Sequence, residues 1–280
     1  MIPMDNKNLT IVFIAFDGYC DLWSDCIKLF HTFWPDCPYK VIFVNNEKGV
    51  EDDDFEVVHA GKNAEWSKKV QLALSKVQTP YVCLLLEDFF IGDIINSKEI
   101  FDILKFIEID KIKYYKLVNM NRAVKNHDPI YKNTNYLHII PESDEYGISL
   151  QAAIWDTEYL KKLVGNGNYN AWKFEFDRVH EAQGKADTEA EGCVFDDRNI
   201  LHLQHAVIQG EYLPGTIKYF KKRGIELNVR RSVMPYRKYY MLRLMSKAKY
   251  AMPKAIRGPI KKAMERMGYT FVSTIRDKEE

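Results

Sequence analysis

Two acidic residues follow directly after the most apolar run of the chain. Residues 81–86 read YVCLLL, and Glu87 and Asp88 come next. A short apolar run of this kind predicts a buried strand, and acidic side chains at the carboxyl end of such a strand lie where open α/β sheets bind their ligands. Carboxylate oxygens suit Mg2+ and Mn2+, which can also bridge a diphosphate. We therefore expect Asp88, with Glu87 as the second ligand, to hold one of these ions, the alternative being a solvated strand end.

A second group of acidic and aromatic residues lies in the sequence NAWKFEFDR at 170–178. A carboxylate can act as a general base that removes the proton of a hydroxyl group as its oxygen attacks a substrate. Glu175 or Asp177 could supply this carboxylate. Trp172 lies three residues before Glu175, so a helix would place both on one face, as an aromatic platform beside a carboxylate. We favour Glu175 as the general base and Trp172 as an acceptor contact; an ordinary amphipathic helix is the alternative.

The elements that would position these groups alternate between strands and helices. Apolar runs predict strands at 10–16, 40–44, 56–59 and 81–86, and helical spacing predicts helices at 22–33 and 64–77. This order implies an α/β fold with a mostly parallel central sheet, flanking helices and right-handed crossovers.

Beyond residue 95 the pattern is more varied. We expect helices at 98–107, 157–164 and 172–183, strands at 114–119 and 148–155, an extended stretch at 200–208, and a loop or short hairpin at 122–146. Thr157 is the expected cap of the helix that it begins.

The chain resembles the GT-A glycosyltransferases, in particular the family 2-like bacterial enzymes that build capsular and lipopolysaccharide glycans. In that family a helix end, a Pro or Gly, a Tyr and an apolar run precede an Asp-x-Asp motif, and here ALSKVQTPY at 73–81 leads into Leu86, Glu87 and Asp88. Asp88 matches the last Asp of the motif, whereas Leu86 stands at the first, which leaves Glu87 as the substitute. The resemblance covers about residues 10–215 and implies the Rossmann-like GT-A fold.

The resemblance also implies roles for residues outside this motif. In the family, residues after the first strand and at the end of the second contact the nucleoside, which corresponds to Asp17 and Asn45. An Asn is neutral where the family commonly has an acid, but its amide can still pair with a uracil edge. Trp66 and Ser67, at the head of the second predicted helix, would line the donor site, although Trp66 suits a core position equally well.

Two later stretches carry further candidates. Many GT-A enzymes bind the metal through a histidine late in the chain, which corresponds to His205 or His202, with a structural histidine as the competing interpretation. Residues 122–133 carry four cationic or titratable side chains that could close over a diphosphate: Arg122, Lys125, His127 and Lys132. A solvated loop is the alternative for that stretch.

The net charge of +1 conceals a division of the chain into an acidic and a basic part. Residues 218–280 hold 18 Lys and Arg against 5 Asp and Glu, a net charge of +13, so the preceding residues carry −12. This asymmetry predicts an anionic partner surface for the basic part. We expect a GT-A catalytic domain over 1–217 and a helical, basic C-terminal extension over 218–280. No known nucleic-acid-binding module accompanies it, so we expect no nucleic-acid partner.

Residues 230–269 interleave Lys and Arg with Tyr, Met, Leu and Ile. This pattern predicts a basic amphipathic helix that lies on an anionic membrane interface, or a helix whose apolar stripe packs on the catalytic domain or on a second subunit. No stretch reaches about 18 uninterrupted apolar residues, the length that crosses a membrane. The five cysteines show no zinc-binding spacing. We expect a cytoplasmic protein, peripheral on the inner face of the cell membrane.

These observations together predict a nucleotide-sugar-dependent glycosyltransferase of bacterial surface polysaccharide biosynthesis. It would move a sugar, with inversion, from a UDP- or GDP-sugar to a glycan or lipid-linked acceptor, with Mn2+ or Mg2+ as cofactor. Two alternatives remain. A nucleotidyltransferase is disfavoured because DGYCD follows the first strand, where such an enzyme carries a Gly-rich basic phosphate loop. A non-catalytic membrane or protein adaptor is compatible with Leu86 at the first motif position.

Overall fold

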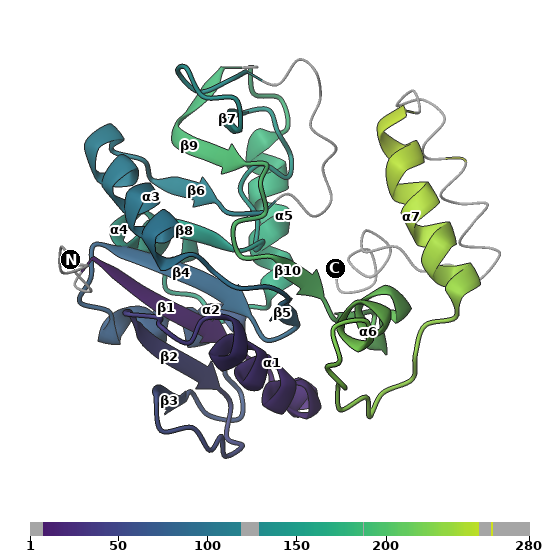
Figure 1. Cartoon of the computed structure of the whole chain (residues 1–280). Coiled ribbons are helices and arrows are strands. Elements are labelled where there is room, and N and C mark those ends of the chain that lie inside the picture. The colour runs from purple at the N-terminus through teal and green to yellow at the C-terminus, as the bar shows by residue number, and fades with distance from the viewer. Residues whose placement is uncertain (1–7, 119–128, 187, 252–258, 260–280) are drawn as a thin grey trace. The chain divides into compact units, whose positions relative to one another are not determined.

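The computed structural model describes residues 8–118, 129–186, 188–251 and 259. Its centre is an eight-stranded sheet with the order β3-β2-β1-β4-β8-β6-β9-β7 (Figure 1). The strands of this sheet are β1 (Leu9–Ile14), β2 (Lys40–Asn45), β3 (Phe55–His59), β4 (Tyr81–Leu86), β6 (Tyr114–Lys116), β7 (Leu137–Pro141), β8 (Ala153–Asp156) and β9 (Glu189–Asp196). Four of the seven neighbouring pairs are parallel, and β8 runs antiparallel to both of its neighbours. The sheet is mixed and mostly parallel, as expected for a Rossmann-like GT-A fold.

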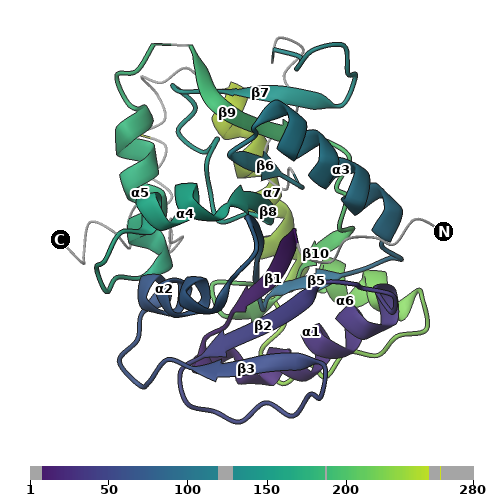
Figure 2. The ribbon, with the colours of Figure 1, turned by 90° about the vertical axis from the view of Figure 1, so that its left-hand side faces the viewer.

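Helices cover both faces of this sheet. Figure 2 shows α1 and α3 on one side and α2, α4 and α5 on the other. The helices of these layers are α1 (Cys20–Phe33), α2 (Trp66–Lys76), α3 (Ser97–Asp110), α4 (Thr157–Val164) and α5 (Ala171–Ala182). Within β1, Ile11 and Phe13 belong to the core that contains α1 and α3, whereas Val12 and Ile14 belong to the core with α2, α4 and α5. A strand covered on both faces needs a continuous apolar sequence. This requirement explains why the sequence of β1 is an almost unbroken apolar run.

Two short ribbons complete the described strands. In one, β5 (Phe89–Ile91) pairs antiparallel with β10 (Leu203–His205); in the other, β11 (Val207–Ile208) pairs with β12 (Glu211–Tyr212). A single 3-10 turn, η1 (Asp17–Tyr19), connects β1 to α1. The first ribbon matters for the site, because it brings a late part of the chain to the carboxyl end of β4.

The elements predicted before residue 87 are confirmed, each within two residues of its expected ends. The later predictions hold in part. The strand expected at 148–155 is shorter, since β8 begins at Ala153. The chain just before it is held by Lys116, whose Nζ donates to the carbonyl oxygens of Tyr146 and Gly147 at 3.0 and 3.2 Å. The extended stretch at 200–208 consists of the two short strands β10 and β11.

The cap of α4 differs from the expected one. Asp156 is the N-cap, and its Oδ1 accepts the N–H of Tyr159 at 2.8 Å. Thr157 donates its hydroxyl to the carbonyl of Thr79 at 3.0 Å instead. Thr157 therefore ties the start of α4 to the loop before β4.

The last two strands in the sheet order, β9 and β7, are not predicted by the sequence. Within the stretch expected to be a loop or hairpin, residues 137–141 form β7, which pairs with β9. The eight residues of β9 include Gly192 at φ 69°, and the strand is exposed or half-exposed over its first half. Such a strand lacks the apolar run or clean alternation that would reveal it, and only its pairing with β6 and β7 defines it.

The contacts divide the chain into Met1–Val233 and Met234–Glu280. The step in charge at residue 218 falls inside helix α6 (Pro214–Lys221), whose Phe220 is fully buried in the first of these parts. The chain after α6 stays attached to α1, since the N–H of Asn228 donates to the Asp25 carboxylate at 2.7 Å. The first compact part thus includes some of the basic residues counted in the extension.

Of the helix predicted within residues 230–269, the structure describes α7 (Tyr236–Ala251), and residues 252–258 and 260–269 lie outside the described residues. Basic and apolar residues alternate around α7 and do not separate into two faces. Tyr240 and Leu244 are exposed. The amphipathic separation expected for a membrane-surface helix is therefore not seen over this range. Among the helices that the structure describes, none is long and apolar enough to span a membrane.

Candidate active site

The carboxyl ends of β1, β2 and β4 meet at one edge of the sheet. Ile14 of β1 is paired with Val44 of β2 and with Leu86 of β4. The polar residues that follow these strands are therefore brought together at this edge, which is where open α/β sheets bind their ligands.

Asp88 and His205 meet at this edge through the ribbon of β5 and β10. His205 is paired with Phe89 in the ribbon, and its Nε2 lies 3.0 Å from Oδ2 of Asp88. The other carboxylate oxygen of Asp88, Oδ1, is buried and has no hydrogen-bond partner among the described residues. A buried acceptor without a donor is costly, so this oxygen is free to bind a cation. His202, the other candidate, is exposed in the turn before β10.

Glu87 is buried beside Asp88 and holds the end of β1. Its Oε1 accepts the N–H of Phe16 at 2.9 Å. Burial, and then the negative charge of Asp88, raise the pKa of Glu87 to about 8, although the N–H of Phe16 and the ammonium of Lys69 oppose this shift. Glu87 is therefore largely protonated at neutral pH until a cation binds nearby. Glu87 can serve as the second carboxylate ligand of such a cation only after it has lost its proton.

Lys69 is a site residue that the sequence did not reveal. It lies on the buried side of α2, and its Nζ donates to the carbonyl of Ala15 at 2.7 Å and to Oδ1 of Asn46 at 3.0 Å. Burial lowers its pKa, and the charges of Glu87 and Asp17 act in the opposite direction. Lys69 thus connects the ends of β1 and β2 and places a cation behind the acidic pair. A single Lys within the apolar stripe of α2 was the available signal.

Asp17 is occupied by the loop that follows β2. Its carboxylate accepts the backbone N–H groups of Asn46, Glu47 and Lys48 at 3.0, 2.9 and 3.0 Å. Partial burial would raise the pKa of Asp17, but these N–H groups and the Lys48 ammonium lower it overall. Asp17 is therefore an anchor of this loop, and all of these donors would have to be released before it could bind a ribose.

Asn45 is fully buried, which conflicts with the expected direct contact with a base. Its Nδ2 donates to Oδ1 of Asp17 at 3.2 Å and to the carbonyl of Lys48 at 2.6 Å, and its Oδ1 lies 2.7 Å from Nδ1 of His59. Both ends of the Asn45 amide are therefore engaged, and Asn45, like Asp17, holds the loop that follows β2. The two residues shape the edge of the site.

Trp66 and Ser67 do not line the site edge. Trp66 is buried in the second core, with its ring centroid 4.9 Å from that of Phe174. Ser67 is fully buried, donates its hydroxyl to the carbonyl of Gly167 at 3.0 Å and accepts the N–H of Tyr169 at 2.8 Å. They attach α2 to the loop before α5, so the expected contact with a donor has no support in their positions.

A further cation approaches the acidic pair from an unexpected part of the chain. The guanidinium of Arg231 lies 4.1 Å above the ring of Tyr19 and binds the carboxylate of Asp21. Burial, and next the charge of Asp88, raise the pKa of Tyr19, and the charge of Arg231 opposes this shift. Arg231 also donates to the carbonyl of Gly18, in the turn that follows β1. Arg231 thus places a positive charge on the same side of the site, although Asp21 neutralises part of it.

Glu175 lies on α5 and faces the chain that precedes β8. Its Oε1 accepts the N–H of Leu150 at 3.0 Å. Burial raises the pKa of Glu175, and the Leu150 N–H and the Lys116 ammonium reduce that shift. Because β8 begins at Ala153, opposite Leu84 near the end of β4, Leu150 and Glu175 lie toward the same edge of the sheet as Asp88. A raised pKa suits a carboxylate that must accept a proton near neutral pH.

The other two predicted residues of α5 are on its solvent side. Asp177 is 42% exposed and forms an i,i+4 ion pair with Lys173 at 3.0 Å. Trp172 is 44% exposed at the start of the helix. This exposure leaves Trp172 available to a sugar, whereas Asp177 has the contacts of an ordinary surface residue. The structure thus separates the two carboxylates, and Glu175 alone is turned inward.

Of the four cationic candidates at 122–133, three (Arg122, Lys125 and His127) lie outside the described residues. Lys132 is described, and its Nζ lies 2.7 Å from the carboxylate of Asp110 at the end of α3. It is therefore engaged away from the acidic pair.

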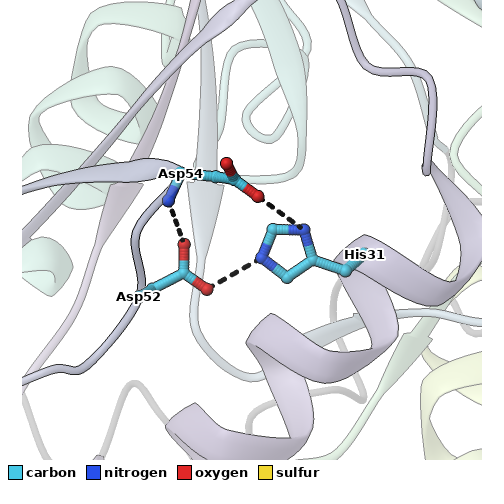
Figure 3. Close-up of side chains that lie close together, drawn as sticks. All are labelled: His31, Asp52 and Asp54. Atoms are coloured by element: carbon cyan, nitrogen blue, oxygen red, sulfur yellow. Dashed lines mark hydrogen bonds and ion pairs between the residues drawn. The ribbon is translucent and has the colours of Figure 1, made fainter.

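His31, Asp52 and Asp54 form another group that could hold a metal ion (Figure 3). Nε2 of His31 lies 2.8 Å from Asp52, and Nδ1 lies 3.9 Å from Asp54, so the two carboxylates face opposite ring nitrogens. Asp52 also accepts the N–H of Phe55 at 3.0 Å where β3 begins. Because Phe55 is paired with Val41 near the start of β2, this group lies at the opposite edge from Asp88. Its contacts fasten the loop before β3.

The buried carboxyl group of Glu87 makes stability depend on pH. Its pKa of about 8 in the folded protein exceeds the usual 4.5 of the unfolded chain, so the folded state keeps a proton that the unfolded state loses. The stabilising effect is complete below about pH 4.5 and is lost as pH rises through 8. We expect Glu87→Gln, measured by urea unfolding with EDTA present, to gain on the order of 2 kcal/mol over wild type between pH 6 and 9.

The matched control for this experiment is Glu108→Gln, at an exposed position of α3. Its stability should follow wild type across the same pH range. Parallel curves for Glu87→Gln and wild type would show that the Glu87 carboxyl does not titrate abnormally.

No family model matches this sequence, and neither does any of the curated proteins with which it was compared. Solved structures match at low similarity. S. aureus TarS 1–349 is 11% identical, with a TM-score of 0.44 over 68% of this chain and 60% of that chain. The same fragment in complex with UDP-GlcNAc is 11% identical, with a TM-score of 0.43 over 77% of this chain and 65% of that chain. A cytidylyltransferase from Leptospira borgpetersenii is 11% identical, with a TM-score of 0.37 over 62% of this chain and 68% of that chain.

This chain covers less than two thirds of either TarS structure. TM-scores of 0.44 or less support no conclusion about this chain. The chemistry of the protein must therefore be sought in its own side chains: an acidic pair with a histidine, two nearby cations, and one inward-facing carboxylate farther along the same edge.

Proposed function

We propose that the protein is a glycosyltransferase that uses a nucleotide-sugar donor and transfers the sugar with inversion. The observation that carries this proposal is the contact of Asp88 with His205, with the buried and unpartnered Oδ1 of Asp88, at the edge where β1, β2 and β4 end. Glu175, a carboxylate with a raised pKa, lies toward the same edge. The first centre suits a cation that binds a diphosphate, and the second suits removal of a proton. Inverting sugar transfer from a nucleotide-sugar can use both.

A divalent cation, Mn2+ or Mg2+, fits the first centre. Oδ1 of Asp88 would bind it, together with a nitrogen of His205 and, once ionised, the carboxylate of Glu87. The ion would neutralise the charge that develops on the diphosphate leaving group. His205 contacts Asp88 directly, so Leu86 at the first motif position does not leave Asp88 without a second metal-binding side chain.

The nucleoside is proposed to lie against Phe16. This ring is 56% exposed immediately after β1, and the Lys69 ammonium lies 5.5 Å from its centroid. An exposed aromatic face at the ligand edge of a sheet can stack with a base, since every base has a flat face. Asp17 and Asn45 would act on the nucleoside indirectly, by holding the loop after β2 in place.

The acceptor is proposed to bind beside Glu175, with Trp172, three residues earlier on the solvent side of α5, as a further contact. Glu175 would take the proton of the acceptor hydroxyl, and the N–H of Leu150 would fix the carboxylate in position. The exposed face of Trp172 would hold the acceptor sugar. Asp177 remains the second candidate for the base.

The identity of the partners rests on the sequence. We propose a UDP- or GDP-sugar as donor, a glycan or lipid-linked acceptor, and a role in the capsule or lipopolysaccharide of a bacterium, at the cytoplasmic face of its membrane. The +13 charge of residues 218–280 supports attraction to an anionic membrane. Since α7 lacks separate faces, this attraction would be electrostatic. Binding to anionic vesicles should fall steeply with salt and be absent with neutral vesicles; salt-independent binding would contradict it.

Calorimetric titration with UDP, GDP and their sugars, with and without Mn2+, tests the proposed activity. We expect metal-dependent binding of one nucleotide family and release of the nucleoside diphosphate when an acceptor is added. Binding of a nucleoside triphosphate with release of pyrophosphate would indicate a nucleotidyltransferase instead. Absence of nucleotide binding under every metal condition would indicate a non-catalytic adaptor.

A further inference from the structure

A pocket lies at the opposite ends of the sheet strands from Asp88. It has a volume of about 290 Å3 and is bordered by α4, α5, β9 and residues 140–148. Its lining includes Arg178, Lys162, Tyr159 and Cys193. Cys193 is paired with Tyr114, the first residue of β6, and β6 runs parallel to β4 because both are antiparallel to β8. The pocket is therefore at the starting end of these strands, away from the proposed donor site.

Arg178 is the feature that makes this pocket unusual. Its side chain is only 9% exposed. One nitrogen, Nη2, donates to the carboxylate of Glu181, but Nε and Nη1 are buried and have no hydrogen-bond partner among the described residues. A guanidinium stays charged in proteins, and a buried donor left without an acceptor costs about 1 to 3 kcal/mol, more for a charged group. The pocket that Arg178 lines is where such an acceptor can enter.

A second cation reaches the same pocket without a partner. Lys162 of α4 is exposed and forms no ion pair with any residue that the structure describes. The other lysines of the lining are neutralised. Lys113 pairs with Glu191 at 2.8 Å, and Lys185 with Glu142 at 3.8 Å. The carboxylates of the lining are engaged as well: Glu142 and Glu191 in these two pairs, Glu181 with Arg178, and Asp144 with the N–H of Tyr146 at 3.4 Å. The lining therefore carries four cations and four carboxylates, and Lys162 is the cation among them that forms no ion pair with a described residue.

We propose that this pocket binds an acidic sugar through its oxyanion group. Nε and Nη1 of Arg178 donate to the oxygens of the anion, and Lys162 supplies the second positive charge. A volume of about 290 Å3 exceeds what a bare anion fills and lies near the lower limit of small-ligand pockets, which leaves room for one sugar ring. The oxyanion is a carboxylate, as in a uronic acid, or a phosphate monoester, as in a sugar phosphate.

Binding of small probes tests this proposal. Isothermal titration of the full chain is carried out with glucuronate, with glucose 6-phosphate and with glucose. We expect at least one acidic probe to bind and glucose not to bind, and the preferred probe identifies the oxyanion. Failure of both acidic probes at millimolar concentration would overturn the proposal.

Variants assign the binding to the pocket. Arg178→Met removes the guanidinium, whose Cζ lies 5.3 Å from the centroid of the Phe174 ring, and should weaken binding by about tenfold or more. Lys162→Met should weaken it severalfold, while Lys161→Met, the neighbouring lysine paired with Glu158, should have no effect. If Arg178→Met fails to fold, the comparison of Lys162→Met with Lys161→Met tests the proposal. Equal affinities of these two variants for the acidic probe would overturn it.

A final comparison separates this pocket from the donor site. Asp88→Asn should bind the preferred probe as wild type does, because Asp88 lies at the opposite ends of the sheet strands. Loss of probe binding in Asp88→Asn would show that the probe occupies the donor site, which would overturn the proposal for this pocket and leave the proposed transferase function standing.

Discussion

Replacing Asp88 by Asn should weaken Mn2+-dependent binding of the nucleotide donor by about 100-fold. The reason is that Oδ1 of Asp88 is the buried acceptor that a cation would use, and an amide supplies neither its charge nor two equivalent oxygens. The measurement is calorimetric titration of UDP- and GDP-sugars into each protein, with Mn2+ and with EDTA. In EDTA the two proteins should bind equally weakly.

The matched control is Asp93→Asn, at an exposed position five residues later. It should bind the donor as wild type does. His205→Gln should resemble Asp88→Asn in a milder form, because it removes the nitrogen 3.0 Å from Oδ2. If Asp88→Asn keeps wild-type affinity in Mn2+, Asp88 does not hold the metal, and the diphosphate must be bound by cationic side chains alone.

Replacing Glu175 by Gln should lower the rate of transfer by about 1,000-fold while the affinity for the donor stays unchanged. Gln can still accept the N–H of Leu150, so the fold of the segment before β8 should be kept. In the wild-type enzyme the rate should rise with pH and level off above the raised pKa of Glu175, because only the ionised carboxylate accepts the proton.

Asp177→Asn provides the comparison for this experiment. Its side chain is 42% exposed and paired with Lys173, so transfer should continue at close to the normal rate. The reverse result, with Glu175→Gln active and Asp177→Asn inactive, would assign the base to Asp177. A Glu175→Gln variant with weakened donor binding would instead place Glu175 among the donor contacts.

The first part of the fold could be predicted because its signals are local. The strands β1, β2 and β4 are largely apolar runs, β3 is a shorter one interrupted by Glu56, and Glu87 and Asp88 follow β4 directly. By contrast, β9 starts with exposed and half-exposed residues and contains Gly192, so only its neighbours in the sheet define it. Pairing between distant segments leaves no periodic trace in the sequence.

The site shows the same limit. The position of Asp88 at a strand end could be predicted, but the contact with His205 depends on a ribbon between segments more than 100 residues apart. The sequence predicts that Asp17 and Asn45 lie at the site, but their side chains bind each other and the loop after β2. The sequence shows the type of a polar side chain but not its hydrogen-bond partners. Those partners decide whether the side chain faces a ligand or its own backbone.

The reversed direction of β8 has a consequence for specificity. Because β8 starts where β4 and β6 end, the chain supplies most of the proposed reaction centre from two stretches that share no strand: residues 14–91, joined by His205, for the nucleotide and metal, and residues 146–175 for the acceptor. Outside the buried contacts between α2 and the segment 167–174, each stretch can therefore change its side chains independently of the other. Enzymes of this construction can exchange one substrate while they keep the other, and a chimera that replaces only residues 146–175 should alter acceptor choice and leave donor choice intact.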